Sequence, residues 1–186
     1  LASAADQLRD DVLAVFDCDV PHAVERALAA CRADLRQLGP VAVSVVVDRD
    51  PSGAVEPATV WPDELAQVLC DLTRNALEAM RGAREPRLEL RVSWLPRGVA
   101  IRVTDSGRGL PRERWEAIFA GGGTGLPNAR ATLAFYRGSL GVEWSEPGLG
   151  TTMLVELARR RTSRMRPVKL VPGPAGRPRA ARVAGG

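Results

Sequence analysis

Two polar side chains on one helical segment have the spacing of a cation site. Asp71 and Asn75 lie four residues apart, so in a helix both side chains leave the same face. Leu72 and Ala76 beside them belong to an apolar stripe, which places the pair at the edge of the buried face. A carboxylate and an amide oxygen there can together hold a hard cation such as Mg²⁺. An ordinary solvated helix face also accounts for this pair, so the pair alone does not decide between the two.

Two glycine-containing segments have residues suited to a planar ring and to phosphates. Residues 105–111 (DSGRGLP) follow an expected strand. Asp105 can accept a hydrogen bond from an exocyclic amine, and the glycines let a ring approach the backbone. Residues 121–126 (GGGTGL) lead into an expected helix, whose free N–H groups and positive dipole end suit phosphate. An ordinary Asp-Gly turn explains the first segment equally well, and the second matches neither the P-loop nor the dinucleotide fingerprint.

The rest of the pattern supplies the elements that must position these segments. Apolar residues recur at helical spacing over four stretches, at 3–16, 23–38, 61–82 and 127–136. Runs of β-branched or alternating apolar residues predict five strands, at 41–47, 88–92, 99–103, 139–145 and 151–157. This order indicates an α/β (α+β) two-layer sandwich, in which helices pack on one face of a mixed sheet.

Composition excludes several classes of protein. The 186 residues are 45% apolar and 26% charged, which is ordinary for a globular domain, and no run of about 18 apolar residues could cross a membrane. The three cysteines stand far apart, which argues against a disulfide framework or a structural zinc site and predicts reduced thiols. Residues 158–186 hold 9 of the 26 basic residues and none of the 22 acidic ones. We therefore expect one domain followed by a basic, disordered tail or linker at 159–186.

In this order and at these spacings, the segments resemble the GHKL superfamily of ATP-binding domains, and most closely the catalytic domain of bacterial sensor histidine kinases. Residues 68–80 look like the N box, residues 105–111 like the first glycine box, and residues 121–126 like the second. Ile118 and Phe119 resemble the short phenylalanine motif. The resemblance covers roughly residues 16–157 and implies a Bergerat-type mixed sheet with helices on one face and a short ATP lid.

The resemblance implies a role for each matching residue around the base. Asn75 would bind a Mg²⁺ ion that bridges the ATP phosphates. Asp105 would accept a hydrogen bond from the adenine amino group, with Thr151 supporting it through water, and Gly107 and Gly109 would border the adenine. Because guanine carries an oxygen where adenine carries that amino group, the resemblance implies a preference for ATP over GTP.

The phosphates would meet the second glycine box. The residues expected to contact them, or to hinge the lid, are Gly121, Gly123, Gly125 and Leu126. The only lysine lies in the tail, so arginines must meet the phosphate charge within the domain. The candidate arginines are Arg74, Arg81 and Arg130.

The chain departs from the histidine kinase pattern at two places. Histidine kinases usually have Asn where this chain has Asp71, whereas ATP-hydrolysing members of the superfamily place an acid there to activate water. Asp71 is therefore either a general base or a second partner of the metal, beside Asn75, and both roles stay open. The lid is also short, because only Ala120 separates Phe119 from the glycines.

The resemblance predicts a kinase domain that hands the ATP γ-phosphate to a histidine outside this chain. The residues around the single histidine, His22, resemble the start of the catalytic domain and not a phosphoacceptor motif. Residues 1–16 would then end a preceding helical hairpin, and residues 17–158 would form the ATP-binding domain. Since the sequence has neither an initiator Met nor a secretory signal, we expect a fragment of a longer, cytoplasmic protein, whose parent the resemblance allows to be membrane-anchored.

The expected partners follow from the same resemblance. They are ATP, the phosphoacceptor hairpin of the parent kinase, a response regulator and a second copy in a full-length homodimer, with no specific nucleic acid and no membrane span in this chain. Two other classes of function stay open. A degenerate nucleotide-sensing or interaction module would explain the short lid and Asp71. The other class is a stand-alone enzyme of the superfamily, either an ATPase, for which Asp71 would activate water, or a serine kinase that acts on a regulatory protein.

Overall fold

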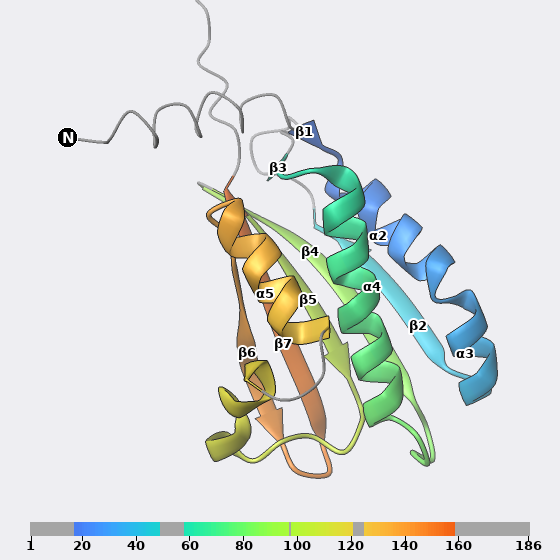
Figure 1. Ribbon diagram of the computed structural model, residues 1–186. Coiled ribbons are helices and arrows are strands. Elements are labelled where there is room, and N and C mark those ends of the chain that lie inside the picture. The colour runs from blue at the N-terminus through green and yellow to red at the C-terminus, as the bar shows by residue number, and fades with distance from the viewer. Residues whose placement is uncertain (1–16, 49–57, 97, 121–124, 159–186) are drawn as a thin grey trace, which may run out of the picture.

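A computed structural model describes residues 17–48, 58–96, 98–120 and 125–158, which form two layers (Figure 1). One layer is a five-stranded sheet in the order β2-β4-β5-β7-β6, in which only β2 and β4 run parallel. The other layer consists of helices that cover one face of this sheet. The expected two-layer sandwich with a mixed sheet is confirmed. The strands of the sheet are β2 (Ala42–Val47), β4 (Arg87–Leu95), β5 (Gly98–Asp105), β6 (Ser139–Glu146) and β7 (Gly150–Ala158).

Helix α4 (Pro62–Ala79) lies across the middle of the sheet, between α2 and α5 (Figure 1). Proline at the first helical position and two acidic residues in the first turn favour a helix start there. Leu65, Leu69 and Leu72 are almost completely buried, so this stripe forms the centre of the core. The helix ends at Ala79 with Met80 as its C-cap, and Gly82 follows with φ = +82°, as expected for a glycine after a helix C-terminus.

The second expected helix is broken into α2 (Val20–Ala30) and α3 (Arg32–Leu38). Helix α2 buries its apolar stripe, whereas α3 has no fully buried side chain. The break falls at Cys31, whose sulfur lies 3.1 Å from the sulfur of Cys70 on α4. Both thiols are buried and free, which agrees with the expectation of reduced, core-forming cysteines. The sequence missed the break because the apolar spacing continues through it.

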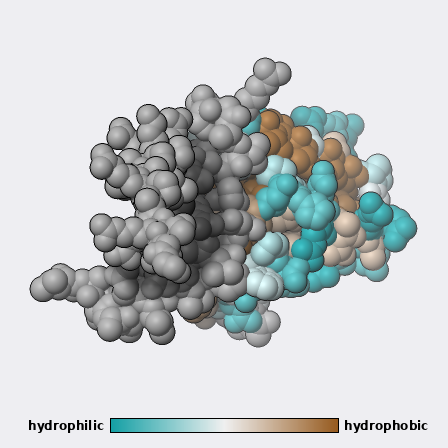
Figure 2. Space-filling view, turned by 90° about the horizontal axis from the view of Figure 1, so that it is seen from above, coloured by the Kyte–Doolittle hydropathy of each residue, from teal (hydrophilic) through white to brown (hydrophobic). Residues whose placement is uncertain are grey.

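The edge strand β2 is the least covered part of the sheet. Val43, Val45 and Val47 are 41–44% exposed, although the register aligns them with buried residues of β4 and therefore with the helix-facing side. In Figure 2 the described surface is a mixture of hydrophilic and apolar residues, with apolar residues along its upper part. The β-branched run thus predicted the strand correctly, but the helices do not cover all of it.

The face of the sheet opposite the helices is polar. Arg102 of β5 makes two hydrogen bonds to Glu143 of β6, at 2.7 and 2.8 Å. Arg91 of β4 pairs with Glu89 on its own strand and with Asp48 beyond the end of β2. A largely antiparallel sheet with one face in solvent is expected to alternate in this way. No helix in the described part of the chain is long and apolar enough to cross a membrane.

The remaining elements are short or lie near the glycine-rich segments. The residues before α5 form two turns of 3₁₀-helix, η1 (Arg112–Arg114) and η2 (Ala117–Phe119), which the sequence did not predict. Helix α5 (Gly125–Phe135) begins two residues earlier than predicted. Two strands of two residues each, β1 (Asp17–Cys18) and β3 (Ala58–Thr59), pair with each other and are too short for a periodicity to reveal. The expected helix at 3–16 and the tail at 159–186 lie outside the described residues.

Replacing Leu69 by Ala should destabilise the fold by about 2–5 kcal/mol, because a fully buried leucine would leave a cavity between α4 and the sheet. Urea unfolding followed by circular dichroism measures this loss. Leu149→Ala is the matched control, since Leu149 is 59% exposed and its truncation should cost little. Equal losses for the two variants would contradict the placement of α4 in the core.

Candidate functional site

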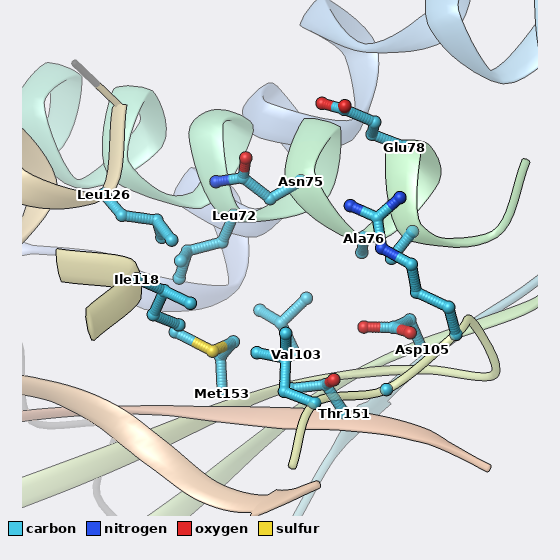
Figure 3. A pocket seen from close by; sticks show the side chains of 14 residues that line it. Leu72, Asn75, Ala76, Glu78, Val103, Asp105, Ile118, Leu126, Thr151 and Met153 are labelled. Atoms are coloured by element: carbon cyan, nitrogen blue, oxygen red, sulfur yellow. The ribbon is translucent and has the colours of Figure 1, made fainter. Parts of the chain in front are cut away.

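A cavity lies between α4 and the ends of two central strands (Figure 3). Its volume is about 140 Å³. Val103 and Asp105 of β5 lie opposite Met153 and Thr151 of β7 in the register, and all four line one wall. The opposite wall belongs to α4, through Leu72, Asn75, Ala76, Glu78 and Ala79. Segments distant in sequence therefore meet in one hollow.

The cavity has an apolar end and a polar end. Ile118 of η2 and Leu126 of α5 form the apolar end, and Figure 3 shows Asp105 at the opposite end. Asn75 and Glu78 come from the α4 side, and Figure 3 shows the Glu78 carboxylate directed away from Asp105. An apolar cavity with a few polar groups at defined points suits a planar ring that carries polar substituents.

Asp105 is a buried carboxylate, only 6% exposed, at the end of β5. The N–H of Gly107 donates to its Oδ1 at 2.7 Å, and the backbone N–H of Thr151 also donates to the carboxylate. Burial raises the pKa of Asp105 to about 6, and the two backbone hydrogen bonds and the charge of Arg108 limit the rise. At neutral pH the carboxylate is therefore mostly ionised and can accept a further hydrogen bond from a ligand in the cavity.

Two glycines hold the loop after Asp105 against its neighbours. Gly109 has φ = +63°, and a Cβ on it would lie 1.9 Å from the carbonyl oxygen of Glu146. A Cβ on Gly107 would lie 2.6 Å from the backbone of Ala79 at the end of α4. Gly109 lines the cavity, whereas Gly107 does not and instead supplies the N–H that holds Asp105. Both positions therefore require glycine for close backbone packing, whatever ligand binds.

Ser145 joins three segments below the polar end of the cavity. Its hydroxyl accepts a hydrogen bond from the N–H of Leu110 at 2.8 Å and donates to the carbonyl of Gly150 at 3.0 Å. The hydroxyl of Thr151 lies 2.9 Å away. Sequence reasoning missed Ser145, because a lone serine near the end of a strand carries no signal. Its contacts hold Thr151 beside Asp105.

The α4 side of the cavity offers hard oxygen donors. Asn75 lines the cavity, and so does Glu78 one turn further along the helix. The described residues contain no group of three or more His, Cys, Asp or Glu side chains able to hold a metal by themselves. An amide and a carboxylate oxygen nevertheless fit Mg²⁺ that keeps several waters and shares phosphate oxygens with a nucleotide. Glu78 was not anticipated, although its spacing of three from Asn75 could have indicated it.

Asp71 lies beside the cavity and not in its wall. Its Oδ1 accepts a hydrogen bond from Gln67 at 3.0 Å, on its own helix. A Cβ built on Gly125 would lie 3.8 Å from the Cβ of Asp71, so the carboxylate lies next to the first residue of α5. The expected pair of Asp71 and Asn75 is thus on one helix near the cavity, with only Asn75 lining it.

None of the three expected arginines lines this cavity. Arg74 pairs with Asp34 on α3 at 3.1 Å, and Arg81 lies in a separate hollow between α3 and α4. Arg130 pairs with Glu116 and lies over the ring of Phe119. The arginine that does line the cavity is Arg108, which sequence reasoning passed over as a loop residue.

The second glycine box is only partly within the described residues. Gly125 and Leu126 begin α5, and Leu126 lines the cavity. Gly121 and Gly123 lie outside the described residues, so their expected contacts with phosphate stay predictions. The cavity therefore brings together five of the expected site residues, Asn75, Asp105, Gly109, Leu126 and Thr151.

The chain is similar to a known protein family and to known sensor proteins. A profile described as histidine kinase-, DNA gyrase B-, and HSP90-like ATPase matches residues 62–161. The C4-dicarboxylate transport sensor protein DctB of Rhizobium meliloti (strain 1021) is 33% identical over 103 residues, which are 51% of this chain and 16% of that protein. Sensor histidine kinase ZraS of Escherichia coli (strain K12) is 33% identical over 104 residues, which are 52% of this chain and 22% of that protein. The chain thus spans only 16–22% of the length of these relatives.

Solved structures share the fold. The mycobacterial sensor histidine kinase MprB superposes with a TM-score of 0.61 at 20% identity, over 75% of this chain and 94% of that one. The catalytic domain of histidine kinase ThkA gives a TM-score of 0.64 at 19% identity, over 76% of this chain and 92% of that one. At this level of identity the likeness establishes the architecture of the domain.

Asp105→Asn should stabilise the fold at pH 7 by roughly 1–3 kcal/mol, because the folded state holds this carboxyl with a pKa near 6 against 3.8 when free. A raised carboxyl pKa means that the folded chain gains stability as pH falls from 7 towards 4. The advantage of the variant should therefore shrink as pH falls, which urea unfolding at pH 7 and pH 5 measures.

Asp63→Asn is the control for this prediction. Asp63 is exposed, and its hydrogen bond to Arg26 lowers its pKa, so its replacement should reduce stability at pH 7. A variant at Asp105 that is less stable than the unchanged chain at pH 7 would show that the buried carboxylate does not carry this energetic cost.

Proposed function

This chain belongs to the family of histidine kinase-, DNA gyrase B- and HSP90-like ATPases, and from that premise we propose that the cavity binds ATP with Mg²⁺ and presents the γ-phosphate to a histidine outside this chain. The observation that carries the proposal is the meeting of Asp105 and Asn75 in one cavity. They lie on elements 30 residues apart in sequence. The carboxylate of Asp105 suits the adenine amino group, and the amide oxygen of Asn75 suits Mg²⁺.

Adenine would bind at the polar end of the cavity. The carboxylate of Asp105 has its backbone donors on the protein side and is available to accept a hydrogen bond from the exocyclic amino group. Guanine would turn a carbonyl oxygen towards the same carboxylate, and the two acceptors would repel each other. The apolar walls formed by Val103 and Met153 suit the faces of the ring.

The phosphates would lie along α4. Asn75 would hold Mg²⁺, and Glu78, three residues further along α4, is a second candidate to bind it directly or through water. Bound Mg²⁺ would neutralise the charge that develops on the phosphate oxygens during transfer. Arg108 is the cationic side chain of the cavity wall and would add to that neutralisation.

The phosphoryl acceptor would come from another part of the parent protein. The chain contains one histidine, His22, which lies at the start of α2 with its N–H capped by Asp19 and which does not line the cavity. Relatives are sensor proteins, one of them a sensor histidine kinase. We therefore propose a phosphoacceptor hairpin, a response regulator and a homodimeric parent as the partners of this domain.

Asp71 favours ATP hydrolysis as a second candidate function. Its carboxylate lies one helical turn from Asn75 and next to the start of α5. A carboxylate in that position could accept a proton from an attacking water. The two candidates differ in the fate of the γ-phosphate, which is measurable.

Isothermal titration calorimetry tests nucleotide binding. The chain should bind Mg-ATP and bind GTP at least tenfold more weakly, because only adenine offers a donor to Asp105. Asp105→Asn should lose tenfold or more in ATP affinity while remaining folded. Asn75→Ala should lose the dependence of affinity on Mg²⁺, whereas Asn128→Ala, an exposed asparagine outside the cavity, should bind normally. No binding at millimolar ATP would favour the degenerate module.

Incubation with ATP labelled at the γ-phosphate separates transfer from hydrolysis. The isolated chain should gain no acid-labile phosphate, because its histidine is not at the cavity. If Asp71 activates water, phosphate should be released steadily, and Asp71→Asn should reduce that release at least tenfold with ATP affinity retained. Gln67→Ala, which removes only the hydrogen-bond partner of Asp71, is the control. Stoichiometric labelling of the unchanged chain would overturn the proposed external acceptor.

A further inference from the structure

Arg130 connects the two elements that form the apolar end of the cavity. Its Nη1 donates to Oε2 of Glu116 at 2.9 Å, just before η2, and its guanidinium carbon lies 4.3 Å from the centre of the Phe119 ring at the end of η2. Arg130 itself is on α5. The side chain of Arg130 therefore makes an ion pair with the residue before η2 and a cation–π contact with the last residue of η2.

The residues held in this way line the cavity although Arg130 does not. Ile118 lies between the two partners of Arg130 in sequence, and Leu126 lies one helical turn before Arg130 on α5. Both line the cavity, at the end opposite Asp105 (Figure 3). The guanidinium thus connects η2 with α5 close to the two apolar side chains.

We propose that Arg130 is a positioning residue, which holds Ile118 and Leu126 against the apolar part of the bound nucleotide, and that it does not bind phosphate. This inference rests on the proposed nucleotide-binding function. It replaces the expectation that Arg130 meets the phosphate charge. The carboxylate of Glu116 already balances the charge of Arg130.

The environment of the two contacts supports this assignment. Phe119 is only 8% exposed, so its ring is a fixed platform for the guanidinium. Arg130 and Glu116 are 42% and 78% exposed, which makes their ion pair weak and the combined restraint moderate. We therefore expect loss of Arg130 to reduce nucleotide affinity three- to tenfold and not to abolish binding.

A positioning role and a phosphate-binding role predict different dependence on the ligand. Ile118 and Leu126 are apolar and would contact the base or the sugar, which adenosine and ATP share. Arg130→Ala in the full chain should therefore weaken ATP, ADP and adenosine by the same factor, with adenosine measured by displacement of ATP. A loss for ATP at least tenfold greater than for adenosine would show that Arg130 binds phosphate.

For Glu116→Gln, the positioning role and the phosphate-binding role predict changes in ATP affinity of opposite direction. If Glu116 and Arg130 act together, the variant should weaken ATP and adenosine binding about twofold or more, and adding it to Arg130→Ala should cause no further loss. If Arg130 binds phosphate instead, removal of the competing carboxylate should strengthen ATP binding. Arg130→Lys, which can keep both contacts, should recover at least half of the affinity lost in Arg130→Ala on a logarithmic scale.

Arg112→Ala is the matched control. Arg112 also lies over an aromatic ring, 4.2 Å from the centre of Trp115, but it does not line the cavity and does not touch α5 in any contact found in the described part of the chain. Its removal should leave nucleotide affinity unchanged. Unchanged affinity in both Arg130→Ala and Glu116→Gln would overturn the positioning role of Arg130 and leave the proposed function intact. An unmodified chain that binds no nucleotide would overturn the proposed function and this inference with it.

Discussion

The site depends on one unfavourable placement, a carboxylate buried at the end of a central strand. Burial disfavours the charge of Asp105, and the fold tolerates it because two backbone N–H groups face the carboxylate. Those N–H groups belong to Gly107 and Thr151, which lie on different elements. The loop after β5 and the start of β7 must therefore both be in place before the acceptor exists. Close glycine packing and the hydroxyl of Ser145 hold them there.

Helix α4 links this acceptor to the core. Leu72 is buried and also lines the cavity, while Asn75 lies less than one turn away on the same helix. The packing of the leucine stripe in the core therefore also places the helix turn that carries Asn75 at the cavity that Asp105 lines. The same contacts stabilise the fold and position the ligand-binding residues. This explains how motifs that are distant along the chain come together at one cavity.

The sequence predicted those parts of the structure that local patterns determine. Helix α4, five strands and the polar end of the cavity follow from apolar periodicity and from a few residue types. The break between α2 and α3 at Cys31 was not predicted, because the apolar spacing is continuous across it. Sequence analysis did not predict that Glu78, Arg108 and Ser145 belong to the site. Their positions depend on which elements meet in three dimensions, and no local spacing records that.

Arg130 shows that residue type alone does not identify the partners of a charge. Because the domain has no lysine, Arg130 was one of three arginines expected to meet the phosphate charge, and its partners in the structure lie 14 and 11 residues earlier in the chain. Its charge is therefore balanced by protein, and the arginine of the cavity wall is Arg108. If Arg130 positions the apolar end, then a single exposed ion pair and one ring contact hold that end in place. Such contacts are weak, so this end of the cavity is held less firmly than the end formed by α4 and Asp105, which the core fixes.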